Sequence, residues 1–521
     1  MEPIPTGEHF RLGSIPAIGT GTDSFSPESR KDFLVLSRRH AIRIGLTAGA
    51  LGVSGATGWT AQALSSRGGR GTAAAAAVPT GPVTPFGVPL TRPPVLEPVR
   101  RSATTDYYSV VMTKARREIL PGTTTELFTY NGSFPGPTIR ARSGRTVVVK
   151  QVNSLSMPTS VHLHGGNNPP ADDGGAMDTI APGASRTYTY ANSQPGATLW
   201  MHDHAHHMES EHVYRGLSNV YLLGDDKEDA LGLPSGEFEV PLVLRDARFD
   251  TDAQLVYEMD DAFNRTTILV NGRPWPVMKV KGRKYRLRLV NASNLRFFAL
   301  QLSDGSPMTQ IGSDGGLLEK PVPTTQLLLT PGERADLVID FAQYRPGTQL
   351  VLKNLMGPGP VEEVGQVMRF DVGARVHDSS RVPATLTSLP APRKATAERS
   401  FQLSMDETGA TQQGFINGKG YDPNRIDTTV KWGATEVWTV TNTNTLIPHN
   451  FHMHLVQFRV LERDGGPAPA SEAGRKDTVV VMPGQTVKLL VTFDSHRGVF
   501  PYHCHLIDHG GMGMMANFKV V

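Results

Sequence analysis

Short runs in which apolar and polar residues alternate recur along the chain from about residue 105 onward. Successive side chains of a β-strand point to opposite faces, so this pattern predicts strands that bury one face. Three of the runs end at an asparagine: Thr146–Asn153, Tyr285–Asn291 and Glu436–Asn442. Few segments carry the spacing of an amphipathic helix, and the chain is therefore expected to be all-β.

The same turn signals flank each of the three runs, in the same order. An Asn-Gly pair precedes each run, and a Pro-Gly pair follows it and begins another alternating strand. The Asn-Gly pairs are Asn131-Gly132, Asn271-Gly272 and Asn417-Gly418, and the Pro-Gly pairs are Pro182-Gly183, Pro331-Gly332 and Pro483-Gly484. This threefold repetition predicts three β-sandwich domains. The alternative is chance recurrence in a chain with 53 Gly and 39 Pro.

The predicted domains occupy residues 105–228, 236–375 and 398–521, and residues 376–397 link the second to the third. Residues 65–104 are rich in Pro and Gly, which is typical of an extended linker or a wrapping arm. Residues 1–64 are expected to be a signal region, because Arg38 and Arg39 form a twin-arginine signature ahead of a weakly apolar run. An anchored or disordered tail is the alternative.

The signal region predicts that the protein passes through the twin-arginine export machinery to an extracellular, cell-surface or periplasmic location. Gly, Ala and Thr dilute its apolar run too much for a membrane span, so no stable membrane insertion is expected.

Composition excludes several classes of protein. The 521 residues include 52 Lys and Arg and 49 Asp and Glu, and a net charge of +3 gives no reason to expect nucleic acid as a partner. The one cysteine, Cys504, excludes an internal disulfide, a Cys-rich zinc finger and a Cys-ligated iron–sulfur cluster.

Ten of the 17 histidines form four short clusters. They are His162 with His164, His202 with His204, His449 with His452 and His454, and His503 with His505 and His509. Residues i and i+2 of a strand share a face, so each His-x-His pair aims two imidazoles at one point. One such pair is common on protein surfaces, but four pairs supply eight imidazoles, which suits a cluster of several metal ions. The middle domain has no histidine in these clusters and is expected to act as a spacer.

Cys504 lies between two of these histidines and therefore points to the opposite face of its strand. There it can join His449 and His509 in a second site, with Met514 as a weak axial ligand. Two imidazoles, a thiolate and a thioether are the ligands of a blue-copper electron-transfer site. Because neighbouring residues serve both sites, the backbone offers an electron path between them.

The motifs HLHG, WMHDH, HNFHMH and HCHLIDHGGMGM resemble those of multicopper oxidases, and the resemblance covers roughly residues 100–521. The segments VNGRPWP, YRLRLVNASN and IGSDGGLL are most similar to the three-domain branch that holds spore-coat laccase, bilirubin oxidase and phenoxazinone synthase. The resemblance implies three cupredoxin-like Greek-key β-sandwich domains and four coppers, namely one type 1, one type 2 and two type 3.

The resemblance also implies a ligand set. The type 1 copper would bind His449, Cys504, His509 and Met514, and the type 2 copper would bind His162 and His452. The type 3 pair would bind His164, His202, His204, His454, His503 and His505.

The implied reaction takes single electrons from a small phenolic, aminophenolic or bilirubin-like reductant at the type 1 copper. The electrons would pass through Cys504, His503 and His505 to the other three coppers, where O2 becomes water. A cuprous-ion oxidase for copper tolerance and a non-catalytic copper-binding protein are the alternatives. A zinc hydrolase is disfavoured, because it gives Cys504 no role.

Reduction of O2 also consumes protons. Asp173 occupies the position of an acid that in the family orients water and supplies protons. A solvated loop acid is the alternative. Several relatives have a glutamate directly after the last type 1 histidine, where this chain has Gly510-Gly511, so a heavier dependence on Asp173 is expected. The remaining histidines near the second cluster, His206, His207 and His212, are expected in a polar surface stretch. An accessory metal site and a lining of the access to the cluster are the alternatives.

Overall fold

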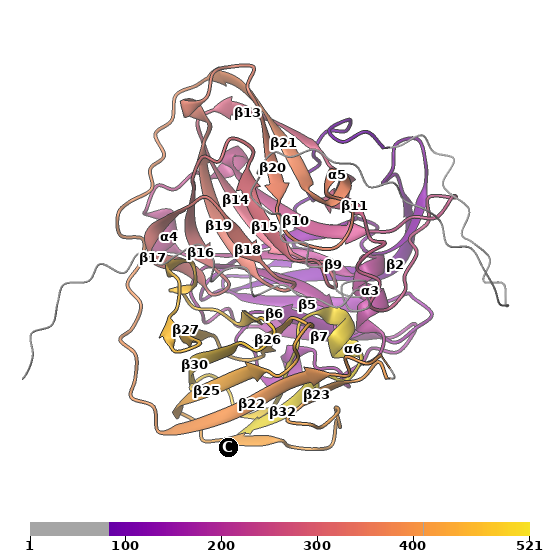
Figure 1. Ribbon diagram of the computed structural model, residues 1–521, viewed down its shortest axis with the longest axis vertical. Helices are drawn as coiled ribbons and strands as arrows, with labels where there is room; N and C mark the ends of the chain where they lie inside the picture. Colours follow the sequence, from indigo (N-terminus) through magenta and orange to yellow (C-terminus); the bar gives the residue numbers. More distant parts are fainter. Residues whose placement is uncertain (1–82, 410) are drawn as a thin grey trace, which may run out of the picture. The chain divides into compact units, whose positions relative to one another are not determined.

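The structure, a computed structural model, describes residues 83–409 and 411–521 (Figure 1). The predicted signal region, residues 1–64, and the first part of the predicted arm lie outside the described residues. Within the described part, no helix has both the length and the apolar character needed to cross a membrane.

The first sandwich consists of two sheets around one apolar core. Its strands are β1 Arg100–Arg101, β2 Thr105–Arg117, β3 Thr125–Tyr130, β4 Gly136–Arg142, β5 Thr146–Asn153, β6 Val161–His164, β7 Ser185–Tyr190, β8 Ala197–Asp203 and β9 Ser218–Gly224. Its helices are α2 Pro170–Asp173, α3 Glu209–Arg215 and α4 Asp226–Asp229. One sheet has the order β1-β2-β5-β7 with β3 paired to β2, and the other has the order β4-β9-β8-β6.

The second sandwich has larger sheets. Its strands are β10 Glu239–Ala247, β11 Thr267–Val270, β12 Arg273–Pro274, β13 Val277–Gly282, β14 Lys284–Asn291, β15 Phe298–Leu302, β16 Met308–Ser313, β17 Gly316–Thr324, β18 Leu327–Leu329, β19 Arg334–Asp340, β20 Gln349–Asn354 and β21 Gln366–Arg375. The helical turns are η2 Gly236–Phe238, η3 Phe341–Gln343 and α5 Val361–Val364. The sheet orders are β12-β11-β10-β14-β19-β16-β17 and β13-β21-β20-β15-β18.

The third sandwich ends the chain. Its strands are β22 Ala397–Met405, β23 Gly414–Ile416, β24 Thr428–Val430, β25 Thr435–Asn442, β26 His449–Met453, β27 Phe458–Arg463, β28 Gly466–Pro467, β29 Thr478–Val481, β30 Thr486–Thr492, β31 Gly498–His503 and β32 Met515–Val520. Its helical segments are η4 Ala470–Glu472 and α6 Ile507–Gly511. The sheet orders are β23-β22-β25-β30-β27-β28 and β24-β32-β31-β26-β29.

The repeated sequence unit is a repeated structural unit. Strands β5, β14 and β25 each pair in parallel with the first long strand of their sandwich, which is β2, β10 or β22. Both residues of every Asn-Gly pair have a positive φ, as the tight hairpin turn requires. The asparagine that ends each strand donates through Nδ2 to two backbone carbonyls, as in the bonds of Asn153 to Met157 and Ile180. The all-β prediction of three β-sandwiches is confirmed, whereas the exact domain limits stay a prediction.

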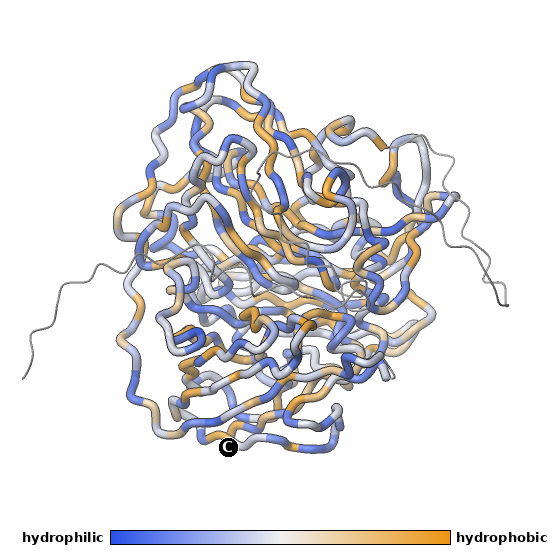
Figure 2. The backbone as a smooth tube through the Cα atoms, in the orientation of Figure 1, coloured by the Kyte–Doolittle hydropathy of each residue, from blue (hydrophilic) through white to orange (hydrophobic). Residues whose placement is uncertain are grey.

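Strand β14 departs from the predicted half-exposed pattern. The tube in Figure 2 alternates apolar and polar residues along the strands, but on β14 even the polar Arg286 and Arg288 are only 2% and 3% exposed. Both guanidinium groups bind Glu228 of α4 in the first sandwich, at 2.6 Å. The outer face of β14 is therefore an interface between two sandwiches, where opposite charges compensate each other's burial.

Candidate metal centre

Eight histidines of the first and third sandwiches surround one point. Each is at most 5% exposed: His162, His164, His202, His204, His452, His454, His503 and His505. Strand pairing sets their positions, since His162 on β6 lies opposite His202 on β8, and His452 on β26 lies opposite His503 on β31. The histidines of the first sandwich contact those of the third directly. The ring of His162 stacks on that of His454 at 3.7 Å between centroids, and His164 stacks on His452 at 3.9 Å.

Backbone carbonyls hold four of these rings in one orientation. The Nδ1 atoms of His162, His202, His452 and His503 lie 2.7 to 3.0 Å from the carbonyl oxygens of Asp173, Asp203, Asp477 and Cys504. A ring nitrogen that donates to a carbonyl carries the hydrogen, so the lone pair is on Nε2. Each Nε2 is thereby left free for another partner.

The free nitrogens fit metal ions. Nε2 of His162, His202 and His452 and Nδ1 of His164 are buried without a hydrogen-bond partner in the described part of the chain. Burial and then the neighbouring imidazole lower the pKa of His202 and of His204 to about 3, so both rings are neutral at pH 7. Neutral imidazole is the form that binds metal, and unpartnered buried nitrogens cost free energy without one.

The second site lies on the other side of β31. The Sγ atom of Cys504 is 3.7 Å from Nδ1 of His449 and 3.8 Å from Nδ1 of His509. Cys504 is fully buried and forms no disulfide. Nε2 of His449 lies 2.9 Å from Oδ1 of Asn444, which leaves Nδ1 of His449 to face the sulfur. Met514 is also fully buried, and its carbonyl accepts a hydrogen bond from the N–H of Cys504.

Electrostatics at this second site favour a cation. Burial disfavours a charge on His509, but Asp260 and Cys504 outweigh it and raise the pKa of His509 to about 10. Oδ1 of Asp260 lies 3.8 Å from Nε2 of His509. The surroundings of His509 thus favour a positive charge. A transition-metal ion held by the Cys504 sulfur and two neutral imidazoles would supply that charge in place of the proton.

Asp173 touches the histidine cluster at two points. Its carbonyl accepts from His162, and its Oδ2 lies 2.7 Å from Nδ1 of His454. The residue is 2% exposed, so it is not a solvated loop acid. Burial raises the pKa of its carboxyl group well above the usual value. A buried carboxyl against two cluster imidazoles can orient them and hold a proton.

A second carboxyl group beside the cluster was not foreseen from the sequence. Glu209 is 4% exposed, burial raises its pKa to about 8, and neither carboxylate oxygen accepts a hydrogen bond from a described side chain. It lines a cavity of about 10 Å³ together with His202, His204, His503, Cys504, His505, Ile507, Gly510 and Met515. The cavity has room for about one water molecule. The helix α3 that carries Glu209 packs closely on α6. Gly511 of α6 permits this packing, since a Cβ there would lie 2.7 Å from Oγ of Ser210.

The other nearby histidines divide into two kinds. His212 was expected at the surface, but it is 1% exposed and its Nδ1 lies 3.2 Å from Oδ1 of Asp203. That expectation was wrong because α3 packs its inner face against the first sandwich. His207 is exposed, and the ring of His206 stacks on it at 3.7 Å.

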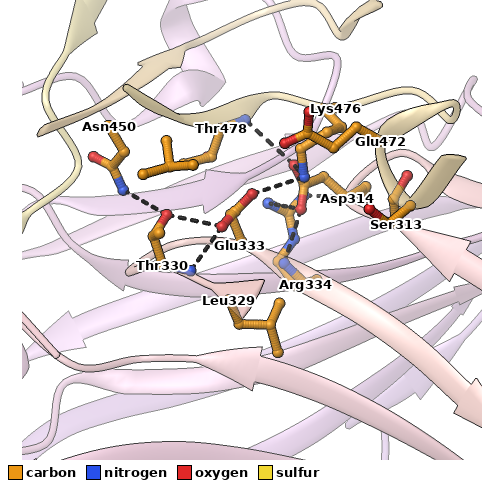
Figure 3. Close-up of polar contacts among 12 residues, drawn as sticks. Ser313, Asp314, Leu329, Thr330, Glu333, Arg334, Asn450, Glu472, Lys476 and Thr478 are labelled. Atoms are coloured by element: carbon orange, nitrogen blue, oxygen red, sulfur yellow. Dashed lines mark hydrogen bonds and ion pairs between the residues drawn. The ribbon is translucent and has the colours of Figure 1, made fainter. Parts of the chain in front are cut away.

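The middle sandwich does more than separate the outer two. Figure 3 shows Arg334 and its neighbours at the meeting point of the second and third sandwiches. Arg334 binds both carboxylate oxygens of Asp477 and donates to the carbonyl of Thr198 in the first sandwich. Asp477 in turn lies 2.9 Å from Nε2 of His164. One buried arginine therefore connects all three sandwiches behind the cluster.

Comparisons with known proteins identify the family. Three family models described as "Multicopper oxidase" match residues 111–228, 240–362 and 391–521. The chain is a multicopper oxidase. It is 35% identical to the laccase of Bacillus subtilis (strain 168), over 82% of this chain and 97% of that one. It is 36% identical to the bilirubin oxidase of Albifimbria verrucaria, over 83% and 81%.

A solved structure agrees with these relatives. The laccase of Pediococcus acidilactici superimposes with a TM-score of 0.77 and 34% identity, over 83% of this chain and 93% of that one. The multicopper oxidase is thus an oxidoreductase that uses O2, with cupredoxin-like domains and copper of types 1, 2 and 3 as its cofactor. Membership confirms the predicted family, fold and cofactor. It excludes the zinc hydrolase and the non-catalytic copper-binding protein.

Proposed function

We propose that this multicopper oxidase takes single electrons from a phenolic or aminophenolic substrate at a type 1 copper and reduces O2 to water at a trinuclear cluster. The observation that carries the proposal is the end of β31, where His503 and His505 face the histidine cluster and Cys504 faces His449 and His509. When bound, copper would cycle between Cu(II) and Cu(I) and so supply the one-electron chemistry.

The proposed ligands are the set that the resemblance to multicopper oxidases implies. The type 1 copper would bind His449, Cys504 and His509, with Met514 as the axial ligand. The type 2 copper would bind His162 and His452. The type 3 pair would bind His164, His202, His204, His454, His503 and His505. Support comes from the free ring nitrogens and from the proximity of Nε2 of His204 and of His454 to Nε2 of His503, at 3.3 Å each.

Two carboxyl groups would supply protons. Asp173 contacts His454 on one side of the cluster, and Glu209 borders the cavity on another side. Burial raises the pKa of both carboxyl groups, to about 8 for Glu209, because a buried carboxylate loses its hydration. Each could give a proton that the reduction of O2 to water consumes, and each carboxylate would then take up a new proton from water.

The proposed substrate class rests on the surroundings of His509. A cavity of about 30 Å³ adjoins it, with these lining residues: Asp260, Ala262, Leu295, Phe297, Met356, Gly357, Pro358, Pro448 and Leu506. This volume holds a hydroxyl or amino group rather than a whole aromatic ring. The Asp260 carboxylate can accept the hydrogen of that group, while apolar residues contact the edge of the ring. A phenol that loses an electron becomes strongly acidic, so an acceptor at this point favours its oxidation.

A cuprous-ion oxidase is the second candidate, on one specific observation. Met356 and Asp260 line the same cavity, and a thioether with a carboxylate suits a copper ion in transit. The two candidate functions can be distinguished by Met356, since only the oxidation of Cu(I) would need its sulfur.

Uptake of O2 by the purified, copper-loaded enzyme tests the proposal. A phenol, o-aminophenol, bilirubin and Cu(I) are compared as reductants, and hydrogen peroxide is measured at the end. Fast turnover of the phenol or aminophenol without peroxide is the expected result. Turnover of Cu(I) alone, lost in Met356→Leu, would select the second candidate instead.

We also propose that the enzyme is exported by the twin-arginine machinery to an extracellular, cell-surface or periplasmic location. Arg38 and Arg39, ahead of a weakly apolar run, support this, and they lie outside the described residues. Fractionation of expressing cells tests it. The protein is expected outside the cytoplasm, and an Arg38→Lys, Arg39→Lys double variant is expected to stay inside. Equal distribution of both proteins would contradict export by this route.

A further inference from the structure

Asn450 lies next to the proposed type 1 site without being one of its ligands. It follows His449 on β26 and is fully buried. Its Oδ1 accepts a hydrogen bond of 2.6 Å from the N–H of His505 and lies 3.6 Å from Sγ of Cys504. One amide oxygen thus contacts two consecutive residues that connect the two metal sites.

The other end of the same amide is held by the middle sandwich. Nδ2 of Asn450 donates to Oγ1 of Thr330 at 3.1 Å, as Figure 3 shows. It also donates to the carbonyl of Pro331 at 2.8 Å. A carbonyl can only accept, and the N–H of His505 can only donate, so both contacts require the oxygen to face the sulfur. The amide orientation is therefore determined by its partners.

The residues of the middle sandwich that contact Asn450 belong to a connection, residues 330–333, which is itself held by hydrogen bonds and an ion pair. Oε2 of Glu333 accepts from both the N–H and the hydroxyl of Thr330, and Oε1 of Glu333 pairs with Lys476 at 2.9 Å (Figure 3). Gly332 lies against the ring of His505, since a Cβ at Gly332 would come within 2.7 Å of Nδ1. This connection, residues 330–333, thus contacts both Asn450 and His505.

The position of the amide oxygen has an electrostatic consequence. Dipoles and hydrogen bonds around the cysteine sulfur tune the potential of a copper–thiolate site. The negative end of the Asn450 dipole points toward the sulfur, and it disfavours the reduced state, which carries one positive charge less. The amide is therefore expected to lower the reduction potential of a type 1 copper bound to Cys504. A lower potential there would increase the driving force for electron transfer from Cys504 toward His505.

We propose that Asn450 is a positioning residue through which the middle sandwich sets the potential of the type 1 copper and the rate of electron transfer to the cluster. This inference rests on the proposed function, because it takes Cys504 as a copper ligand. The two can fail separately. Copper-loaded wild-type protein without intense thiolate-to-copper absorption would contradict the type 1 site itself, whereas an intact band that Asn450 does not influence would overturn only this inference.

The test compares Asn450→Leu with wild type, each fully loaded with copper. The variant is expected to show a raised type 1 potential, a displaced charge-transfer maximum, and internal electron transfer slowed about threefold or more after anaerobic reduction. Asn517→Ala is the matched control, since Asn517 is a buried asparagine of the same sandwich that bonds to Asp422 and Arg425 through its side chain. The control is expected to keep the wild-type potential and band.

Thr330→Val keeps the test decisive if Asn450→Leu does not fold. It removes one hydrogen-bond acceptor of Asn450 and leaves every residue beside the sulfur unchanged. A smaller shift of potential and band in the same direction is expected. Wild-type potential and band in Thr330→Val, and in Asn450→Leu where it folds, would overturn the proposal.

Discussion

Asp477 of the third sandwich lies 2.9 Å from Nε2 of His164 in the first, and both oxygens of its carboxylate bind Arg334 of the second. A carboxylate behind a histidine fixes which ring nitrogen is free to bind a metal. Here that carboxylate depends in turn on a guanidinium group from a sandwich with no cluster histidine. The geometry of the cluster is therefore a property of all three sandwiches together.

This dependence makes Arg334 a sensitive point. Arg334→Met leaves a buried carboxylate without its cation, and it is expected to lower the free energy of unfolding by about 3–5 kcal/mol. It is also expected to reduce the copper content of the purified protein, because His164 loses its support. Urea unfolding and copper analysis measure the two effects.

Arg369→Met is the matched control for this experiment. Arg369 and Asp371 form a partly exposed pair, with 21% and 29% of their side chains accessible. Its loss is expected to cost less than about 1 kcal/mol and no copper. Equal effects of the two substitutions would contradict the proposed importance of the buried network.

The two carboxyl groups at the cluster are expected to share proton delivery. Asp173→Asn should reduce kcat by about 100-fold and Glu209→Gln by about tenfold, with copper content and visible absorption unchanged. Neither amide can release a proton at neutral pH. Asp172→Asn and Glu211→Gln are the neighbouring controls, and both are expected to retain wild-type turnover. Near-full turnover of copper-loaded Asp173→Asn would contradict its role, whatever Glu209→Gln does.

Asp260 is expected to distinguish substrates that carry a hydroxyl hydrogen from those that do not. Asp260→Asn should lower kcat/KM for phenols about tenfold, because the acceptor loses its charge. Ferrocyanide gives up an electron without a proton, so its oxidation is expected to change little. Asp261→Asn is the adjacent control, since Asp261 pairs with Arg248 outside the cavity. An equal loss for phenols and ferrocyanide would indicate general damage to the site.

The interface between the first two sandwiches predicts a pH dependence of stability. Burial raises the pKa of Glu239, but Arg288, Arg286 and Arg140 outweigh it and lower the pKa to about 2. A lowered pKa stabilises the folded protein above the unfolded value of about 4.5, and this stabilisation is lost as the pH falls toward 2. A shift of this size corresponds to about 3 kcal/mol.

Urea unfolding of wild type and Glu239→Gln at pH 7 and pH 3 measures this contribution. The difference between the two proteins is expected to be largest at pH 7 and to shrink at pH 3. Glu237→Gln, which removes a surface pair with Lys281, should change stability by less than about 1 kcal/mol. A difference that stays constant between the two pH values would contradict the assignment to Glu239.

The sequence predicted the strands and the directions of side chains along them, because both depend on local periodicity. Alternation gave strand β5 with both ends correct. The i, i+2 spacing predicted that both histidines of each His-x-His pair point to one cluster, although only His162 and His164 both lie inside a strand and the second histidine of each other pair follows a strand end. The same rule separated Cys504 from His503 and His505. These inferences succeed because a strand converts sequence spacing into direction without reference to the rest of the chain.

The sequence did not predict contacts between side chains far apart along the chain. Glu209 meets Gly510 across about 300 residues, and Arg334 meets Asp477 across 143. No local pattern encodes such a pairing. Two signals were nonetheless present. Asn450 is a polar residue between His449, a proposed ligand, and the apolar Phe451, and Gly510-Gly511 leaves space that a neighbouring side chain can fill.

The central claim is that Cys504 connects an outer electron-accepting copper to an inner oxygen-reducing cluster. Cys504→Ser, loaded with copper, tests it most directly by visible absorption and O2 uptake measured on the same sample. The account predicts loss of the intense visible band and of O2 uptake with every reductant, while the histidine cluster retains its copper. A variant that keeps both its colour and its O2 uptake would contradict the account.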